Sequence, residues 1–114
     1  DKYKWFSKAS LTKWLSDPKD DVLLVARKNG TPIGMIMVYS LRDWAFCVGL
    51  FVEKEHRRLG LGKKLLDEAT RRLKEKGVES LLLLVDVKNE DGVRFYEREK
   101  YYKGFQFHMM TKIL

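Results

Sequence analysis

An α/β fold, with one mixed sheet and helices on both of its faces, is predicted by three features of this sequence. Apolar strand-like segments come first, and a strand–helix–strand–helix–strand alternation follows them. The chain has 114 residues, so we expect 1–114 to be a single domain. Its residues are 45% hydrophobic, which supplies a packed core and excludes wholesale disorder.

A short helix and a β-hairpin are predicted before residue 40. The apolar residues of Leu11–Leu15 recur at helical spacing, and Asp17-Pro18 ends this helix. Val22–Ala26 and Ile33–Tyr39 are apolar β-type segments. Asn29-Gly30 lies between them and supplies the positive φ angles that a hairpin turn requires.

Trp44–Val52 predicts a third strand. It is apolar almost throughout, so we expect both of its faces to be covered. Gly49 lies inside this segment, where a glycine weakens pairing and commonly marks a β-bulge.

The longest helix is predicted over about Gly60 to Lys76, with Gly77 as its C-terminal stop. The spacing predicts two i,i+4 ion pairs on its solvent face, Asp67 with Arg71 and Glu68 with Arg72. Its expected buried stripe is Leu61, Leu65, Leu66, Ala69 and Leu73.

The last third of the chain predicts two strands around one helix. Ser80–Val87 is aliphatic until Asp86, which is typical of a central, parallel strand. A helix is expected from about Glu90 to Lys100. Phe105, Phe107 and Met109 then alternate with polar residues, which predicts a final strand and a candidate edge for a homodimer.

The segment Arg57–Lys64 (Arg-Arg-Leu-Gly-Leu-Gly-Lys-Lys) is the most informative part of the sequence. Its two glycines let backbone N–H groups approach a ligand at the start of a helix. A helix N-terminus ordinarily recruits acidic or hydroxyl residues, whereas this one has four basic residues and no such cap. A bound polyanion explains this pattern, and the net charge of +7 favours an anionic ligand. The alternative is a solvated basic loop before a surface helix.

Several other ligand classes are disfavoured by the same residues. A P-loop needs Ser or Thr after Lys63, where Lys64 stands, and a dinucleotide fingerprint needs a third glycine at Leu65. One cysteine and two histidines are too few for a structural zinc site, so no metal is expected. Leu59 and Leu61 are poor stacking platforms, which argues against nucleic acid. No apolar segment approaches the roughly 20 residues of a membrane helix, so no membrane partner is expected.

Two blocks of the sequence resemble the GCN5-related N-acetyltransferase (GNAT) family. The pattern Arg57-x-x-Gly60-x-Gly62 after an apolar strand is similar to the family's acetyl-CoA pyrophosphate loop. The second block begins with Leu83–Asn89 and is similar to the family's strand–Asn–helix–Tyr signature, with a seven-residue step from Asn89 to Tyr96. Together the matches cover about residues 22–114. The resemblance implies a three-layer α/β/α acyl-CoA N-acyltransferase fold in which the family's N-terminal strand and helices are shortened or absent.

The resemblance also implies a place for acetyl-CoA as co-substrate. In the family, the strand before the loop splays from the next parallel strand, and by this resemblance main-chain groups of Leu50, Phe51 and Val52 would hold the pantetheine arm. Asn89 would hydrogen-bond the same arm. Arg57 and Lys64 would add charge beside the diphosphate. The backbone amides expected to hold the diphosphate are those of Arg58, Leu59, Gly60, Leu61, Gly62 and Lys63.

The implied reaction is direct transfer of the acetyl group to an amine of a protein, a peptide or a small molecule. Tyr96 would protonate the leaving thiolate, although a half-buried tyrosine with a satisfied hydroxyl is the alternative. Many relatives place an acidic base on the strand occupied here by Val48-Gly49-Leu50, and this chain has none there. Asp86 has the best location for the base, but it would serve equally as a turn cap. Cys47 is expected to be a small buried residue rather than a nucleophile.

Four further residues, Asp43, Glu53, His56 and His108, are candidates for the base by type alone. The missing acid and the short N-terminus favour a second hypothesis, a CoA-binding or sensory module without turnover. The single cysteine cannot form an internal disulfide and is consistent with a reducing, cytoplasmic location.

Overall fold

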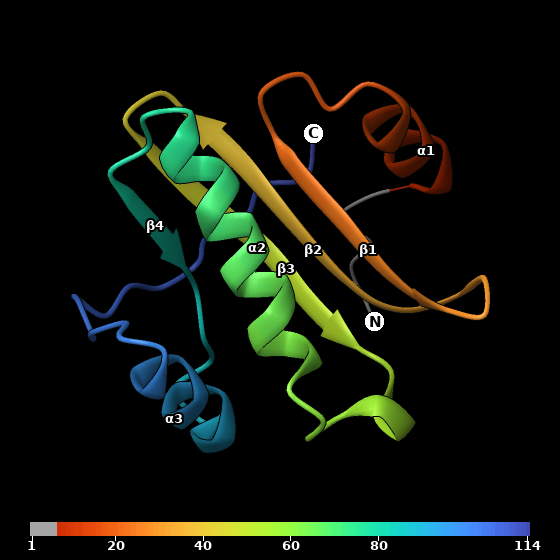
Figure 1. The fold of residues 1–114 in the computed structure, drawn as a ribbon. Coiled ribbons are helices and arrows are strands. Elements are labelled where there is room, and N and C mark those ends of the chain that lie inside the picture. The colour runs from red at the N-terminus through yellow and green to blue at the C-terminus, as the bar shows by residue number, and fades with distance from the viewer. Residues whose placement is uncertain (1–6) are drawn as a thin grey trace. The chain divides into compact units, whose positions relative to one another are not determined.

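The computed structural model describes residues 7–114, which contain three α-helices and four strands (Figure 1). The chain divides into two compact units, Asp1–Leu84 and Val85–Leu114. No helix within 7–114 has the length and apolar character required to cross a membrane. The elements are α1 (Lys8–Ser16), β1 (Val22–Lys28), β2 (Thr31–Leu41), β3 (Trp44–Val52), the 3-10 turn η1 (Lys54–His56), α2 (Leu61–Glu75), β4 (Ser80–Leu83) and α3 (Glu90–Arg98).

The first unit contains one mixed sheet of order β1-β2-β3-β4, which confirms the predicted sheet type. β1, β2 and β3 are antiparallel neighbours, and β4 runs parallel to β3. The predicted hairpin turn forms as expected, because Asn29 and Gly30 have φ angles of 51° and 81°. The third strand has the bounds that its apolar run predicts, Trp44–Val52.

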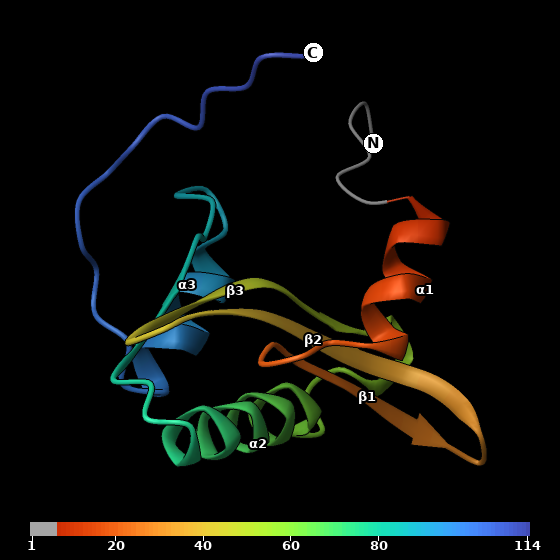
Figure 2. The same cartoon turned by 90° about the horizontal axis from the view of Figure 1, so that it is seen from above.

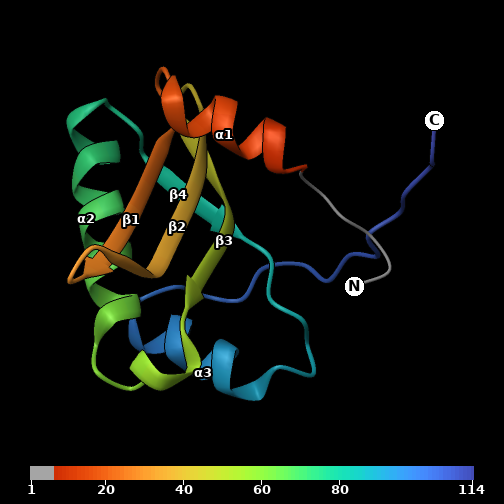
Figure 3. The same cartoon turned by 90° about the vertical axis from the view of Figure 1, so that its right-hand side faces the viewer.

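Helices cover both faces of this sheet, as predicted (Figures 2 and 3). On one face α2 lies so close to β2 that a Cβ at Gly34 would stand 3.1 Å from Leu65. On the other face, α1 stacks the Trp14 ring on Tyr39, with centroids 4.6 Å apart. Asp21 fixes this contact, because its carboxylate accepts from the Trp14 indole N–H at 3.0 Å and from the backbone N–H of Ser40 at 2.8 Å.

A bulge in β3 interrupts the sheet at the predicted position. Met37 pairs with Gly49 and Val38 pairs with Cys47, so Val48 is the extra residue. The parallel ladder between β3 and β4 ends at Cys47, just before this bulge. A bulge bends its strand and increases the local twist, which is consistent with the end of the parallel ladder at this point.

The strand predicted over Ser80–Val87 is therefore wrong in two respects. It is regular only over Ser80–Leu83, and it lies at the edge of the four-stranded sheet rather than at its centre. The aliphatic sequence favours a strand along its whole length, but a strand persists only where a partner pairs with its backbone.

The long helix follows its prediction closely. Leu65, Leu66, Ala69 and Leu73 are buried, and Leu61 is half-buried. Gly77 has a left-handed φ of 85°, and the amide of Val78 donates to the carbonyl of Leu73 at 3.0 Å. This is the glycine-stopped helix end that the sequence indicates.

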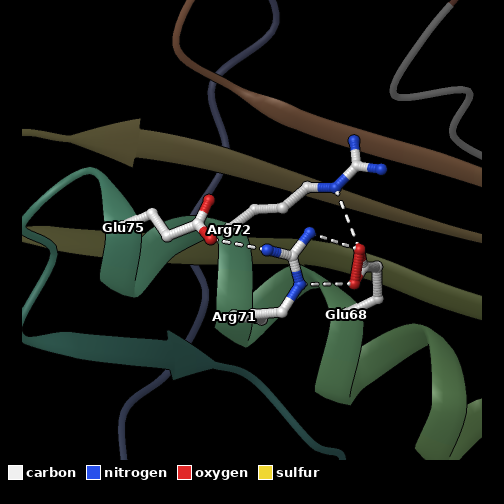
Figure 4. A network of polar contacts seen from close by, with 4 residues as sticks. All are labelled: Glu68, Arg71, Arg72 and Glu75. Atoms are coloured by element: carbon white, nitrogen blue, oxygen red, sulfur yellow. Dashed lines mark hydrogen bonds and ion pairs between the residues drawn. The ribbon is translucent and has the colours of Figure 1, made fainter.

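The polar face of α2 differs from the prediction in one ion pair (Figure 4). Glu68 pairs with Arg72 as expected, but Arg71 pairs with Glu68 and Glu75 instead of Asp67. The guanidinium fork of Arg71 bonds both oxygens of Glu68, at 2.9 and 2.7 Å, a geometry that a one-contact pair with Asp67 cannot match. These hydrogen bonds with Arg71, aided by Arg72, lower the pKa of Glu68 to about 2.

The second unit holds α3 and a C-terminal segment without regular structure. α3 ends two residues earlier than predicted, at Arg98, and Lys100 has a left-handed φ of 73°. The strand predicted at Phe105–Met109 is wrong: no strand forms there, and Phe105 and Phe107 are 89% and 81% exposed. Alternating apolar residues suit a sheet surface, but without a partner strand and a core they do not hold an extended ladder.

Candidate functional site

The first part of the site is the open edge of β3. The Glu53 N–H donates to the Ile33 carbonyl at 2.8 Å, which identifies this pair as hydrogen-bonded across β2 and β3. In an antiparallel ladder such pairs alternate, so Phe51 and Gly49 also direct their N–H and C=O groups toward β2. The backbone groups of Leu50 and Val52 point to the opposite side, beyond the end of the β4 ladder.

This register separates the three residues predicted to hold the pantetheine arm. Leu50 and Val52 present backbone donors and acceptors at the open edge, whereas those of Phe51 are directed at β2. The side chain of Phe51 is 57% exposed, and its ring covers Gly49, where an added Cβ would lie 2.5 Å from the ring. Gly49 therefore has a second role besides the bulge, which is to accept this ring.

The second part of the site is the N-terminus of α2. Gly60 precedes the helix with a left-handed φ of 78° and provides no side-chain cap. The first bond of the helix runs from the Lys64 amide to the Gly60 carbonyl at 3.0 Å. The amides of Leu61 and Gly62, in the first turn of the helix, precede this first bond and have no helical carbonyl one turn earlier to accept them. Such an end of a helix binds anions through its N–H groups and its dipole.

Positive charge gathers around this helix end. Arg58 adopts a left-handed φ of 64°, and Arg57 lies at the end of η1, beside β3. Lys63 forms an exposed ion pair with Asp67 at 3.2 Å, so its charge is shared along α2.

His56 lies in η1, and its Nδ1 is buried without a hydrogen-bond partner. Nothing in residues 7–114 groups three metal-binding side chains of the His, Cys, Asp and Glu type.

The hydrogen bond of the Arg57 side chain is not predictable from the sequence. Its Nε–H donates to the carbonyl oxygen of Val52 at 3.0 Å. The spacing of five residues gives no recognisable signal for this contact, which depends on the turn between the two residues.

Cys47 is buried beside the bulge, as expected for a small core residue. Burial raises the pKa of its thiol to about 11, an effect opposed in part by the Gly49 amide. Because the thiolate is the nucleophilic form, a thiol with this pKa is unsuited to covalent catalysis at neutral pH.

In the second unit, Asn89 is the N-cap of α3. Its Oδ1 accepts from the Gly92 amide at 3.0 Å, and a Cβ at Gly92 would lie 2.5 Å from its Nδ2. The oxygen of Asn89 is thus used within the helix, and its amide nitrogen is the group that can donate to a ligand. The cap was not predicted, although an Asn directly before an expected helix is a signal for it.

Asp86 caps the turn before α3. Its Oδ1 accepts from the Lys88 amide at 2.9 Å, and its carbonyl accepts from the Asn89 amide at 2.9 Å. This is the turn-cap alternative that the sequence left open. Tyr96 lies half-buried on α3, with edge-to-face contacts to Phe95 and Tyr101 at 5.1 and 5.4 Å between centroids.

Comparisons with known proteins found relatives of this chain in sequence and in structure. A sequence model described as the acetyltransferase (GNAT) family matches residues 2–101. The chain is 29% identical over 93 residues to an uncharacterized N-acetyltransferase of Methanocaldococcus jannaschii, a match that covers 75% of this chain and 41% of that protein. The chain thus spans about two fifths of that relative's length.

Solved structures share the fold. An aminoglycoside acetyltransferase from an uncultured soil metagenomic sample superposes with a TM-score of 0.82 at 23% identity, covering 98% of this chain and 77% of that chain. The ribosomal-protein-S18-alanine N-acetyltransferase of Escherichia coli superposes with a TM-score of 0.74 at 22% identity, covering 89% of this chain and 65% of that chain. These similarities confirm the predicted acyl-CoA N-acyltransferase fold.

Proposed function

The chain belongs to the GNAT family of acetyltransferases, and from that premise we propose that it transfers an acetyl group from acetyl-CoA directly to an amine. One observation supports this most strongly: the open edge of β3 and the uncapped N-terminus of α2 occur in the same unit. The first suits an amide-bearing arm, and the second suits a diphosphate. Because the family match spans 2–101, both units would belong to one GNAT-like domain.

The coenzyme would bind through backbone groups. The amides from Arg58 to Lys63 would hold the diphosphate, with the positive charges of Arg57 and Lys64 nearby. Leu50 N–H and C=O, and the N–H of Val52, would pair with the pantetheine amides as an added strand does. The nitrogen of the Asn89 side chain would donate to the same arm.

The reaction forms a C–N bond and breaks a C–S bond. A backbone N–H of β3 would stabilise the oxyanion of the tetrahedral intermediate. A phenol is ordinarily protonated at neutral pH, so the hydroxyl of Tyr96 would give its proton to the departing thiolate. Asp86 is the proposed base: one oxygen already accepts from the Lys88 amide, and the other would take the proton of the amine. No step needs a covalent enzyme intermediate, which agrees with the buried thiol of Cys47.

The acceptor is an amine of a small molecule or of a protein. Two kinds of structural relative support these alternatives, one named for aminoglycosides and the other for a ribosomal-protein alanine. An assay with both classes of amine discriminates between them.

Calorimetric titration tests the ligand class before any acceptor is known. We expect acetyl-CoA to bind more tightly than dephospho-CoA, and both to bind more tightly than ATP, which lacks the pantetheine arm. Release of free thiol from acetyl-CoA in the presence of an amine library then tests transfer. A protein that binds ATP as well as acetyl-CoA would contradict the proposed role of the β3 edge.

Replacing Tyr96 by Phe tests the proposed acid. The rate should fall by several-fold to about 100-fold while the affinity for acetyl-CoA stays nearly unchanged, because only the proton donor is removed. Single-turnover kinetics measures the first quantity and calorimetry the second. An unchanged rate would remove Tyr96 from this role.

A CoA-binding or sensory module without turnover is the second candidate. Two observations favour it: Val48–Leu50 of β3 contains no acidic residue, and the Asp86 carboxylate already caps a turn. Such a module binds acetyl-CoA but releases no thiol with any amine.

A cytoplasmic location and a homodimer complete the proposal. The free thiol of Cys47 supports a reducing compartment, since a lone buried cysteine needs no oxidising environment. Exposed apolar side chains at Phe105, Phe107 and Met110 support self-association. Sedimentation equilibrium at several concentrations would measure the oligomeric state.

A further inference from the structure

Arg57 ties the end of β3 to the start of the glycine loop. Its Nε–H donates to the Val52 carbonyl at 3.0 Å. Between them lies η1, and the backbone N–H of Arg57 closes that turn by donating to the Lys54 carbonyl at 3.4 Å. One residue therefore fixes this corner through its backbone and its side chain together.

The carbonyl that Arg57 occupies is one of those at the open edge of β3. Glu53 and Phe51 direct their groups at β2, so the Val52 carbonyl points to the side where no strand continues the sheet. Without Arg57 that acceptor would be left to water or to a ligand. With Arg57 in place, the edge offered to a pantetheine arm ends at the Val52 N–H.

The residues directly after Arg57 have unusual backbone conformations, so the hydrogen bond from Arg57 to Val52 matters for the loop. Arg58 has a φ of 64° and Gly60 has a φ of 78°, so two of the next three residues are left-handed. A residue with a side chain adopts this conformation only where its surroundings enforce it. The contact to Val52 holds the chain immediately before the first of these residues.

We propose that Arg57 is a positioning residue for the coenzyme, acting through its hydrogen bond to Val52 rather than through its charge. This inference rests on the proposed binding of acetyl-CoA. An exposed cation beside a diphosphate contributes a screened attraction, whereas the hydrogen bond sets where the loop amides and the strand edge lie.

Two substitutions separate the donor from the charge. In Arg57→Gln the side-chain amide nitrogen lies as many bonds from Cα as the Nε of arginine, so the donor is kept and the charge is lost. In Arg57→Lys the charge is kept, but the side chain carries no donor at that position. Lys64→Gln is the matched control, because it removes an exposed charge from the same helix end without touching Val52.

Calorimetry with CoA at one ionic strength gives the comparison. We expect Arg57→Gln and Lys64→Gln to weaken binding by no more than about threefold, and Arg57→Lys to weaken it by about tenfold or more. Rescue by glutamine distinguishes positioning from a general loss of folding. A reversed order of the two Arg57 variants, or equal losses in both, overturns the proposal.

A measurement on the free protein separates this inference from the proposed function. The Nε–H of Arg57 should exchange with water more slowly than that of Arg58, as followed by ¹⁵N-detected NMR of the arginine side chains. If the wild-type protein binds no CoA while this protection is present, the proposed function fails. If CoA binds while the Arg57 Nε–H exchanges as fast as that of Arg58, the positioning role fails.

Discussion

The two helices that follow strands in this protein, α2 and α3, begin in opposite ways. α3 is capped by Asn89 and carries Glu90 and Asp91 in its first turn. α2 begins at Gly60, with no side-chain cap and no acidic residue in its first turn. At α3, acidic side chains offset the positive end of the helix dipole, and the Asn89 side chain accepts from one otherwise unbonded amide. At α2 no side chain of the first turn does either.

This difference separates a structural helix start from one available to a ligand. A cap of the α3 kind would compete with an anion for the same amides. At α2 the adjacent side chains are cations, which repel the positive end of the helix until an anion arrives. The sequence records the contrast directly, because basic residues stand where acidic ones are preferred.

Replacing Gly60 by Glu should give the largest effect and would break the contrast. The carboxylate would place a negative charge at the positive end of α2, on a residue whose φ of 78° already disfavours a side chain. We expect the affinity for CoA to fall by more than about 100-fold in calorimetry.

Gly30→Glu is the matched control for that change. Gly30 has a φ of 81° and, like Gly60, nothing within 4 Å of an added Cβ, so the backbone strain is similar. It lies in the β1–β2 hairpin, away from α2 in the sequence. Equal losses of affinity in both variants would assign the effect to strain and not to the helix end.

A smaller effect is expected when the start of α3 is made to resemble that of α2. Asn89→Ala removes the cap and should lower the free energy of unfolding by about 1 kcal/mol. Asn89→Asp keeps an accepting oxygen and should change it by less than about 0.5 kcal/mol. Urea titration measures both values.

The same pair of variants reports on the proposed contact with the pantetheine arm. Asn89→Asp removes the amide donor while retaining the cap, so weaker CoA binding at unchanged stability would support a ligand contact. Unchanged binding would limit Asn89 to its role in the helix.

Effects on stability alone, of about 1 kcal/mol or less, are expected where the two helices agree, at their C-termini. Lys100 takes the left-handed position in α3 that Gly77 takes in α2, with φ angles of 73° and 85°. Amides close both ends in the same way, Tyr101 onto Tyr96 and Val78 onto Leu73, each at 3.0 Å. Lys100→Gly should therefore raise the free energy of unfolding by about 0.5–1 kcal/mol.

Gly77→Ala provides the converse test of the helix ends. An alanine at φ 85° should lower the free energy of unfolding by about 1 kcal/mol, although an added Cβ would meet no atom within 4 Å. Thermal or urea unfolding measures both changes. A loss of stability in Lys100→Gly, or a gain in Gly77→Ala, would show that the left-handed backbone is not what limits these positions.

Features set by neighbouring residues in the chain were predicted well from the sequence. The bounds of β3, the bulge at Gly49 and the glycine stop of α2 follow from local periodicity and from the conformational range of glycine. The basic start of α2 could also be recognised from the sequence, because a helix N-terminus ordinarily prefers acidic or hydroxyl residues.

Features that depend on a distant partner were not predicted. β4 is short because its ladder with β3 ends at the bulge, and Phe105–Met109 is no strand because no strand pairs with it. Whether Leu50 or Phe51 directs its backbone groups to the open edge depends on the register between β2 and β3. The hydrogen bond from the Glu53 N–H to the Ile33 carbonyl fixes that register. No pattern within β3 alone determines which of its residues turn outward.

Asn89 and Gly92 constrain the order in which their positions can change. A side chain at 92 would displace the amide of Asn89 from its capping position, since an added Cβ would stand 2.5 Å from its nitrogen. Alanine at 92 should therefore cost less stability when residue 89 is smaller, for example Ser. Of the two mutational routes to that double variant, the one that begins at position 89 avoids an intermediate in which the Asn89 cap is displaced.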